Sequence, residues 1–355
     1  MQNSAKEYDL NLFSEKNIRK HVLSQYALQD AQIQQIKFKD TDKQRAVFKI
    51  TTDNSSYCLK KVYFSKDVLF FVYSGIEWFY RHNINVPKII STSNSSRFVE
   101  YENMYFILTV WIEGEKCNYE VRDNIINAAK NLALMHKVSK NFYPIDGSLK
   151  RESFDNLNTS LCKHFKQILL SSNNAFKYGD KFSKAYLLQF ENNQLLAKTS
   201  ADVSSTIKFS NLSKSLCHLD YVNKNILFDS SKKLWVIDFD NCEMDYSVHD
   251  IAYFLRRILK RNTTSWDTKL TIECLNCYEK IRPLSLDEYK YIYSYLVFPQ
   301  KYWKISRDYY NNIHKCNENS FLTLLKNCVK NEDAMLNFRY DFGKYIENRF
   351  KITII

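Results

Sequence analysis

The stretch that most constrains this chain lies at residues 218–240 and reads HLDYVNKNILFDSSKKLWVIDFD. Two short apolar runs, at 226–229 and 234–237, are separated by four polar residues, which is typical of a β-hairpin. Acidic and amide side chains stand just before the first run and just after the second: Asp220, Asn225, Asp238 and Asp240. A hairpin would bring these groups to one end, so they read as a site rather than as turn-formers.

The simplest register for this hairpin pairs residue 229 with 234, which then places Asn225 opposite Asp238. Paired residues in antiparallel strands have Cα atoms about 5 Å apart. A carboxamide and a carboxylate at that distance are oxygen ligands suited to Mg²⁺. Asp220, five residues before Asn225, can accept a proton from an attacking hydroxyl. We therefore expect a site for phosphoryl transfer, with Asp229 a turn residue.

The remaining chain divides into a strand-rich first part and a helix-rich second part. Strands are predicted at both ends of 46–62, around a turn at 52–55, and at 104–112. Helices are predicted at 65–83, 122–138 and over most of 153–200 and 266–350. We thus expect an α+β fold with a small sheet lobe at 1–110, a linker at 111–114 and a large helical lobe at 115–355, which includes the hairpin 218–240.

Composition argues against several classes of protein. The net charge is +12, but the lysines are spread along the chain, so we expect no nucleic-acid partner. The most apolar stretch, 68–79, is about half a membrane span and contains Glu77, so we expect no membrane insertion. The N-terminus lacks the apolar region of a signal peptide, which predicts cytoplasmic synthesis. The nine cysteines are then expected to be reduced thiols.

The pattern H-x-D-x-x-x-x-N, a short hairpin and then hydrophobic-D-F resembles that of protein kinases and aminoglycoside phosphotransferase-like kinases. The resemblance covers about residues 30–350 and implies a bilobal kinase-like fold that uses ATP and Mg²⁺. It implies that Asp220 is the catalytic base that orients the acceptor hydroxyl. The implied metal ligands are Asn225 and Asp238, with Asp240 as a further candidate.

The same resemblance implies supporting roles for further residues. Lys60 matches the sheet lysine that contacts the α- and β-phosphates, and strand alternation places it on the opposite face from Lys61. The linker residues whose backbone would meet adenine are Val110, Trp111 and Ile112. The residues implied to organise the site are His218 and Asp250, which would hold the catalytic loop, and Glu77, or less well Asp67, which would pair with Lys60. A solvated Lys60, and an Asp250 that only begins a helix, remain the structural alternatives.

A narrower resemblance, to the spore coat protein family named after CotS, rests on four segments. They are LCHLDYVNKNIL at 216–227, IDFD at 237–240, VHDIAYFLRRILKR at 248–261 and LVFPQKYWKISRDYY at 296–310. This resemblance implies synthesis during sporulation, location in the spore coat and other coat proteins as partners.

Three departures from the phosphotransferase pattern leave two functions open. Leu219 stands where those enzymes have glycine, the predicted nucleotide loop 48–57 contains no glycine, and no acid is an unambiguous partner for Lys60. The chain is either an ATP- and Mg²⁺-dependent phosphotransferase with an unidentified hydroxyl acceptor, or a kinase-like structural or recruiting component of the coat. Residues 150–215 carry 10 Lys and Arg against 5 Asp and Glu, which disfavours a polycationic acceptor.

Overall fold

The β-branched and aromatic runs near the N-terminus form an antiparallel sheet in the computed structural model, which describes residues 12–39 and 45–354. The sheet order is β1 (Gln32–Lys39), β2 (Arg45–Thr51), β3 (Ser56–Val62), β6 (Met104–Val110) and β4 (Ile89–Ile90), with β5 (Val99–Tyr101) also paired to β6. β2 and β3 are joined by the predicted turn, where the N–H of Thr52 donates to the carbonyl of Ser55 at 2.9 Å. Lys60 faces Ile107 of β6 in the register, so it lies near the middle of the sheet.

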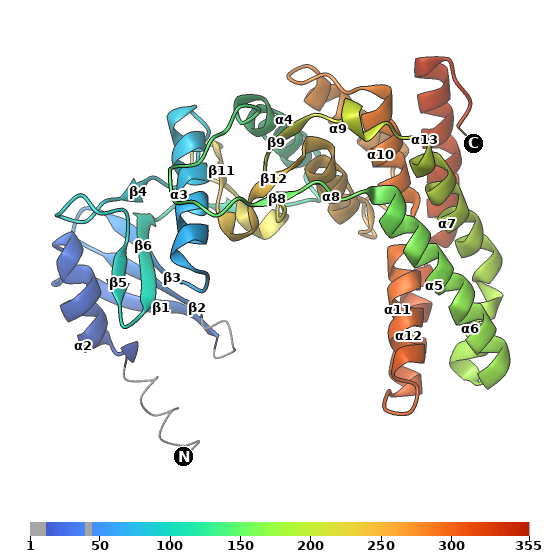
Figure 1. Ribbon diagram of the computed structural model, residues 1–355, viewed down its shortest axis with the longest axis horizontal. Coiled ribbons are helices and arrows are strands. Elements are labelled where there is room, and N and C mark those ends of the chain that lie inside the picture. Colours follow the sequence, from blue (N-terminus) through green and yellow to red (C-terminus); the bar gives the residue numbers. More distant parts are fainter. Residues whose placement is uncertain (1–11, 40–44, 355) are drawn as a thin grey trace. The chain divides into compact units, whose positions relative to one another are not determined.

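Both faces of this sheet are covered, and strand alternation decides which side chains each cover meets. The N-terminal helical segments α2 (Glu15–Asn17), η1 (Ile18–Val22) and η2 (Leu23–Tyr26) lie on one face (Figure 1). Their apolar residues share a buried cluster with Leu59 and Leu108. On the other face, Val62 and Ile107 pack against Leu69 of α3 (Lys66–Arg81). Lys60 alternates with Leu59 and so points to the α3 face, whereas Lys61 points toward the N-terminal cover. The two lysines thus lie on opposite faces of the sheet, as predicted.

The chain divides into two compact units, and the hairpin belongs to the unit with the sheet. The first unit contains residues up to Cys117, 141–152 and 223–242, and the second contains 118–140, 153–222 and the remainder from 243. This division differs from the expected boundary near 111–114, which had assigned the hairpin to the helical part. The reason is pairing: β10 (Ile226–Phe228) pairs with β11 (Leu234–Val236) and also with β7 (Glu115–Lys116), which directly follows the linker.

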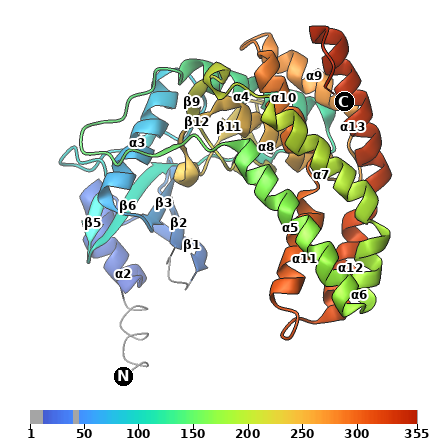
Figure 2. The same cartoon turned by 45° about the vertical axis from the view of Figure 1, so that its right-hand side comes forward.

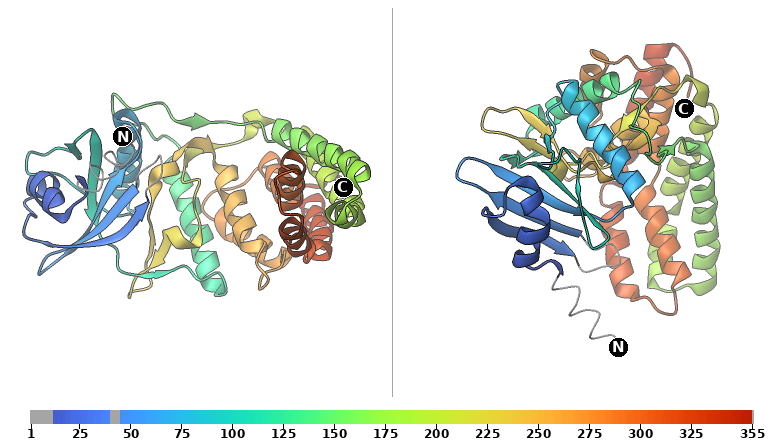
Figure 3. Two further views of the ribbon diagram at one scale, coloured as in Figure 1. Left: turned by 90° about the horizontal axis from the view of Figure 1, so that it is seen from below. Right: turned by 60° about the vertical axis from the view of Figure 1, so that its left-hand side comes forward.

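The second unit is mostly helical, and its first helix has the bounds that the apolar periodicity predicts. α4 (Arg122–Val138) buries Ile125, Ala129, Leu132 and His136 on one face. The later helices are α5 (Leu157–Tyr178), α6 (Lys181–Leu188), α7 (Phe190–Ser205), α8 (Ser247–Leu259), α9 (Thr268–Glu279), α10 (Leu286–Val297), α11 (Gln300–Asn311), α12 (Glu318–Val329) and α13 (Glu332–Phe350). α5 packs on α7 and α11, and α12 packs on α6 and α11 (Figure 2). Several of these helices are seen along their axes in Figure 3, left.

Short elements connect these helices to the loop that carries Asp220. β9 (Lys214–Cys217) pairs antiparallel with β12 (Glu243–Tyr246), so the strand before the loop is fixed to the strand before α8. The other short elements are β8 (Glu152–Ser153), η3 (Phe209–Asn211), η4 (Asn223–Asn225) and η5 (Phe239–Asn241). Within the described residues, none of the helices combines the length and the apolar character needed to cross a bilayer.

Candidate active site

The hairpin forms, but its register is one residue away from the predicted one. Phe228 pairs with Leu234, so Asp229 does not. The first strand ends at Phe228 and the second at Val236, each one residue before its predicted end. The prediction that Asn225 faces Asp238 is therefore wrong. A slip of one residue matters because it exchanges the two faces of a strand.

Asp229 explains the slip, because its side chain organises the turn instead of a strand. Its Oδ1 accepts hydrogen bonds from the backbone N–H groups of Ser231 and Lys233, at 2.8 and 2.9 Å. Its Oδ2 accepts a bond from the indole N–H of Trp235 at 2.9 Å. These bonds occupy the turn N–H groups that have no partner across a ladder. Asp229 is thus a turn residue, as predicted, but within a longer turn.

The corrected register still places Asn225 beside the end of the second strand. The N–H of Ile237 donates to the backbone carbonyl of Asn225 at 3.0 Å. Asp238 follows directly and has a φ of +68°, a left-handed conformation that ends the strand and begins η5. Such a conformation is uncommon for a residue other than glycine, and residues that adopt it cluster at functional positions.

Lys60 makes ion pairs with both carboxylates that follow the hairpin. Its Nζ lies 2.8 Å from Oδ1 of Asp238 and 2.6 Å from Oδ1 of Asp240, and its side chain is 17% exposed. Burial by itself would lower the pKa of Lys60, but the charges of Asp240 and Asp238 outweigh burial and raise it. The amine therefore stays charged, and the sheet lysine is not the ordinary solvated lysine of the structural alternative.

Asp240 is the most buried acid of this group and is incompletely satisfied. Its Oδ2 is buried and has no hydrogen-bond donor among the described residues, while its Oδ1 is held by Lys60. Its backbone carbonyl accepts a bond from Nη1 of Arg151 at 2.9 Å. A buried carboxylate oxygen without a donor is costly, so a cation is the kind of ligand that would complete it. Arg151 was not singled out from the sequence, because no motif marks its loop.

Two of the three predicted linker residues already use their N–H groups within the sheet. Val110 donates to the carbonyl of Lys88 at 2.9 Å, and Trp111 donates to the carbonyl of Ser56 at 3.0 Å. Ile112 follows the end of β6, and its N–H makes no hydrogen bond to the described part of the chain. Of the three residues, only Ile112 can therefore offer a backbone donor to an adenine ring.

The acids that form ion pairs with Lys60 do not come from the following helix, where Glu77 or Asp67 was expected to supply one. Glu77 forms an ion pair with Arg81, one turn further along α3, at 3.4 Å. Asp67 accepts a hydrogen bond from the hydroxyl of Ser65 and one from the N–H of Val68, at the start of the same helix. The acids that hold Lys60 come instead from the hairpin end, because the sheet face of Lys60 turns toward η5.

In the second unit, the loop that carries Asp220 is held by a buried carboxylate. Asp250, in the first turn of α8, accepts the backbone N–H of His218 at 2.7 Å through Oδ2 and that of Leu219 at 3.1 Å through Oδ1. The N–H of Asp220 donates to Nδ1 of His218 at 3.2 Å. Asp250 and His218 thus form hydrogen bonds with the backbone of the loop that carries Asp220.

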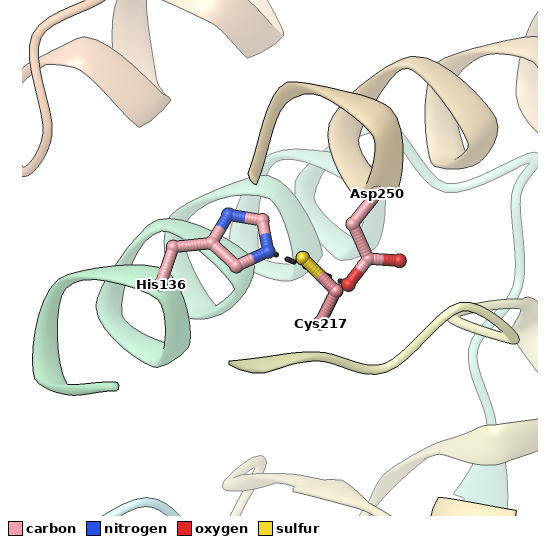
Figure 4. A group of neighbouring side chains, drawn as sticks. All are labelled: His136, Cys217 and Asp250. Carbon is pink, nitrogen blue, oxygen red and sulfur yellow. Dashed lines mark hydrogen bonds and ion pairs between the residues drawn. The ribbon is translucent and has the colours of Figure 1, made fainter. Parts of the chain in front are cut away.

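A second histidine, His136 of α4, completes this buried network (Figure 4). Its Nδ1 lies 2.6 Å from the hydroxyl of Tyr278, and its Nε2 lies 3.4 Å from Oδ2 of Asp250. Burial lowers the pKa of His136, so the ring is neutral near pH 7. Burial would raise the pKa of Asp250, but the bond from His136 and the N–H of His218 hold it below its usual range.

Cys217 lies beside this pair, and the three side chains would form a metal-binding set by distance alone. Their ligand atoms lie within 4.8 Å of one another (Figure 4). However, both oxygens of Asp250 and both ring nitrogens of His136 are already in hydrogen bonds. Burial also raises the pKa of the Cys217 thiol, which disfavours the thiolate that binds metals. The cluster is better explained as the support of the loop.

Comparison with known proteins identifies the family of the chain. Residues 39–284 match the model of the phosphotransferase enzyme family, which is more than half of the chain. The chain therefore belongs to the phosphotransferase enzyme family, and its fold is the bilobal kinase-like α+β fold predicted from the sequence.

A more particular similarity is to spore coat protein S of Bacillus subtilis strain 168. The two chains are 18% identical over 332 residues, which cover 91% of this chain and 93% of the other. Among solved structures, an aminoglycoside phosphotransferase of Alicyclobacillus acidocaldarius has a TM-score of 0.74 at 19% identity, over 92% of this chain and 96% of that one. A microcompartment-associated aminopropanol kinase has a TM-score of 0.59 at 13% identity, over 93% and 99%.

A spectinomycin phosphotransferase in complex with ADP and spectinomycin also shares the fold, with a TM-score of 0.56 and 17% identity over 88% of this chain and 94% of that one. These structural similarities are all below 25% identity and concern the fold.

Proposed function

We propose that this protein is an ATP- and Mg²⁺-dependent phosphotransferase that transfers the γ-phosphoryl group to a hydroxyl acceptor and associates with the spore coat. The observation that carries the proposal is the pairing of Lys60 with Asp238 and Asp240 at the end of the hairpin. A lysine and two carboxylates held together from distant parts of the sequence have no evident value for the sheet itself. They are the groups that nucleotide phosphates and a metal ion require.

The donor set at the hairpin end fits a hard cation. The N–H of Ile237 donates to the backbone carbonyl of Asn225, which keeps Asn225 at the end of the hairpin. Asp240 has a buried carboxylate oxygen without a donor among the described residues. Asn225, Asp238 and Asp240 would hold Mg²⁺, since carboxylate and amide oxygens are its preferred protein ligands. When bound, the ion would neutralise the phosphate oxygens. Lys60 would then exchange its carboxylate partners for the α- and β-phosphates, while the Ile112 N–H would meet adenine.

In the proposed reaction, Asp220 acts on the acceptor. Its carboxylate takes the proton of the acceptor hydroxyl as the hydroxyl oxygen attacks the γ-phosphorus atom. The bond from the γ-phosphorus to the bridging oxygen breaks, ADP leaves with the electron pair, and the acceptor becomes a phosphate ester. Asp250 and His218 hold the Asp220 loop in place, which lowers the cost of orienting the base.

The first test is thermal unfolding of the protein with and without ATP and Mg²⁺. At one hundred times its dissociation constant, a ligand of the native state adds about 2.7 kcal/mol of stability, so we expect Tm to rise by several degrees. The Asp238→Asn and Lys60→Met variants should lose most of this rise. Asp146→Asn is the matched control, because Asp146 is an exposed acid of the same unit and should keep the full rise.

Transfer is tested separately, by ADP release with candidate hydroxyl acceptors. Asp220→Asn should keep the ATP-dependent rise in Tm but lose transfer by about 10²–10⁴-fold, the usual contribution of a general base. An unchanged transfer rate in this variant would remove Asp220 from the mechanism. Absence of any ATP effect at millimolar concentration would contradict the proposal as a whole.

A second candidate function is supported by the β2–β3 turn. It contains no glycine, and two of its N–H groups are engaged internally: that of Thr52 donates to the carbonyl of Ser55, and that of Ser55 donates to Oγ1 of Thr52 at 3.1 Å. A turn closed in this way offers less backbone to phosphates than a glycine-rich loop does. A structural or recruiting component of the coat without transferase activity would show no ADP release with any acceptor, whether or not ATP raises Tm.

A further inference from the structure

A cavity of about 380 Å³ lies within the second unit, among α8 and α10–α13. Its wall carries five cationic side chains, Arg256, Arg257, Lys260, Lys301 and Lys304, and a single carboxylate among the described residues, Glu332. Aromatic rings also line it: Tyr253, Trp266, Tyr295, Phe298 and Tyr302. The volume is in the range of small-molecule sites in proteins. None of these residues belongs to the proposed nucleotide site.

Among the cations of the cavity wall, Arg256 has a partly buried guanidinium group with incomplete hydrogen bonding. Its guanidinium lies over the ring of Tyr295, 3.9 Å from the centroid, and its Nη1 donates to Oε1 of Gln300 at 2.7 Å. Its Nε and Nη2 are buried and have no acceptor in the part of the chain that the structure describes. Buried donors on a charged group are costly to leave unsatisfied, so negative charge placed near this guanidinium would stabilise it.

The carboxylate of the cavity wall does not supply this acceptor. Glu332 is buried and accepts hydrogen bonds from the side-chain amides of Asn192 and Asn193. Burial raises the pKa of Glu332, which weakens its value as a counter-ion. The positive charge at this place is therefore uncompensated by the described residues around it.

The excess of positive charge also affects the pKa of a neighbouring lysine. Partial burial, together with the charges of Arg257 and Lys301, lowers the pKa of Lys260 to about 8. Like charges gathered around a cavity destabilise the folded chain unless an anion joins them. The five cations carry more positive charge than a ligand with one carboxylate would neutralise, which favours a ligand with a doubly charged anionic group.

We propose that this cavity binds a small organic phosphate, with the phosphate group held by Arg256 and the other cations of the cavity wall, and a ring packed on the aromatic wall. Guanidinium groups match the paired oxygens of phosphate. The site lies wholly within the second unit, so the proposal does not depend on phosphotransferase activity.

The experiment is calorimetric titration of the full chain, without ATP, with glucose 6-phosphate, inorganic phosphate and glucose. We expect both phosphates to bind, the sugar phosphate more tightly, and glucose not to bind. Arg256→Gln should weaken glucose 6-phosphate binding about tenfold or more, since bonds to charged groups are worth that factor. Arg257→Gln and Lys260→Gln, which change less buried residues, should each weaken it severalfold.

Two controls separate this site from others. Lys137→Gln removes an exposed lysine of the same unit and should leave the Kd unchanged. Lys60→Met tests whether the phosphate binds at the nucleotide site instead. Loss of binding in Lys60→Met with no change in the three cavity variants would overturn the proposal, as would absence of binding at about 10 mM, where even millimolar affinity would be seen.

Discussion

Leu219 occupies a backbone conformation that usually belongs to glycine. Its φ is +56°, and its N–H donates to Asp250. This is one of the three departures of the sequence from the phosphotransferase pattern, and the structure gives the physical reason for glycine there. A left-handed conformation costs a residue with a Cβ atom roughly 1–2 kcal/mol. The hydrogen bond from the Leu219 N–H to Asp250 offsets part of this cost and stabilises the left-handed conformation.

We therefore predict that Leu219→Gly lowers the free energy of unfolding by less than about 1 kcal/mol. The relieved strain offsets the lost burial and the greater freedom of glycine in the unfolded chain. The control is Leu28→Gly, at a half-buried leucine whose φ is negative, which should cost more than about 2 kcal/mol. Urea unfolding measures both values, and equal costs would show that Leu219 is not strained.

Among the strands, the approach of β7 to β10 depends on Gly114. A Cβ atom at this position would lie 2.7 Å from the carbonyl oxygen of Phe228 and 3.1 Å from its carbonyl carbon. Both are backbone atoms, so no side-chain rotation can make room. Gly114 precedes the residues that pair with β10, and it thus permits the hairpin to join the unit of the sheet.

Gly114→Ala should therefore destabilise the protein by about 2–3 kcal/mol, near the upper end of the usual cost of overpacking. Gly179→Ala is a control that isolates backbone conformation. Gly179 has a φ of +63°, but no described atom lies within 4 Å of the place that an added methyl group would take, so about 1 kcal/mol is expected. If thermal or urea unfolding ranks the two variants equally, the close approach at Gly114 is not the constraint that we describe.

For the molecule as a whole, the charge of the chain bears on its acceptor. The net charge is +12, and residues 150–215 contribute five more cations than anions, 10 against 5. Such a field repels polycations and attracts anions over distances comparable to the Debye length. From this charge we therefore expect no preference for cationic acceptors.

If the proposed transfer occurs, kcat/KM for kanamycin should be at least about tenfold below that for neutral sugar acceptors, since each 1.4 kcal/mol of unfavourable interaction is about a factor of ten. The measurement is ADP release at matched acceptor concentrations, repeated at high salt. Salt should reduce the difference, because it screens exposed charges. Rapid turnover of kanamycin at low salt would contradict this prediction.

Much of the fold follows from local sequence patterns. The bounds of α4 follow from apolar periodicity, and the β2–β3 turn follows from polar residues between β-branched runs, because both depend on neighbours in sequence. The positions of Lys60 and Lys61 on opposite faces follow from strand alternation alone. The hairpin register did not follow, because the bonds of one side chain, Asp229, extend the turn.

Spacing along the chain is enough to predict the family pattern, the hairpin and the acids at its end, because these features are local. Which acids hold Lys60 depends on tertiary packing, since Asp238 and Asp240 are 178 and 180 residues away from it. The same is true of the buried contacts of Asp250 and of the unsatisfied donors of Arg256. Contacts between residues so far apart in the sequence form only when the secondary-structure elements pack together, so no local sequence pattern predicts them.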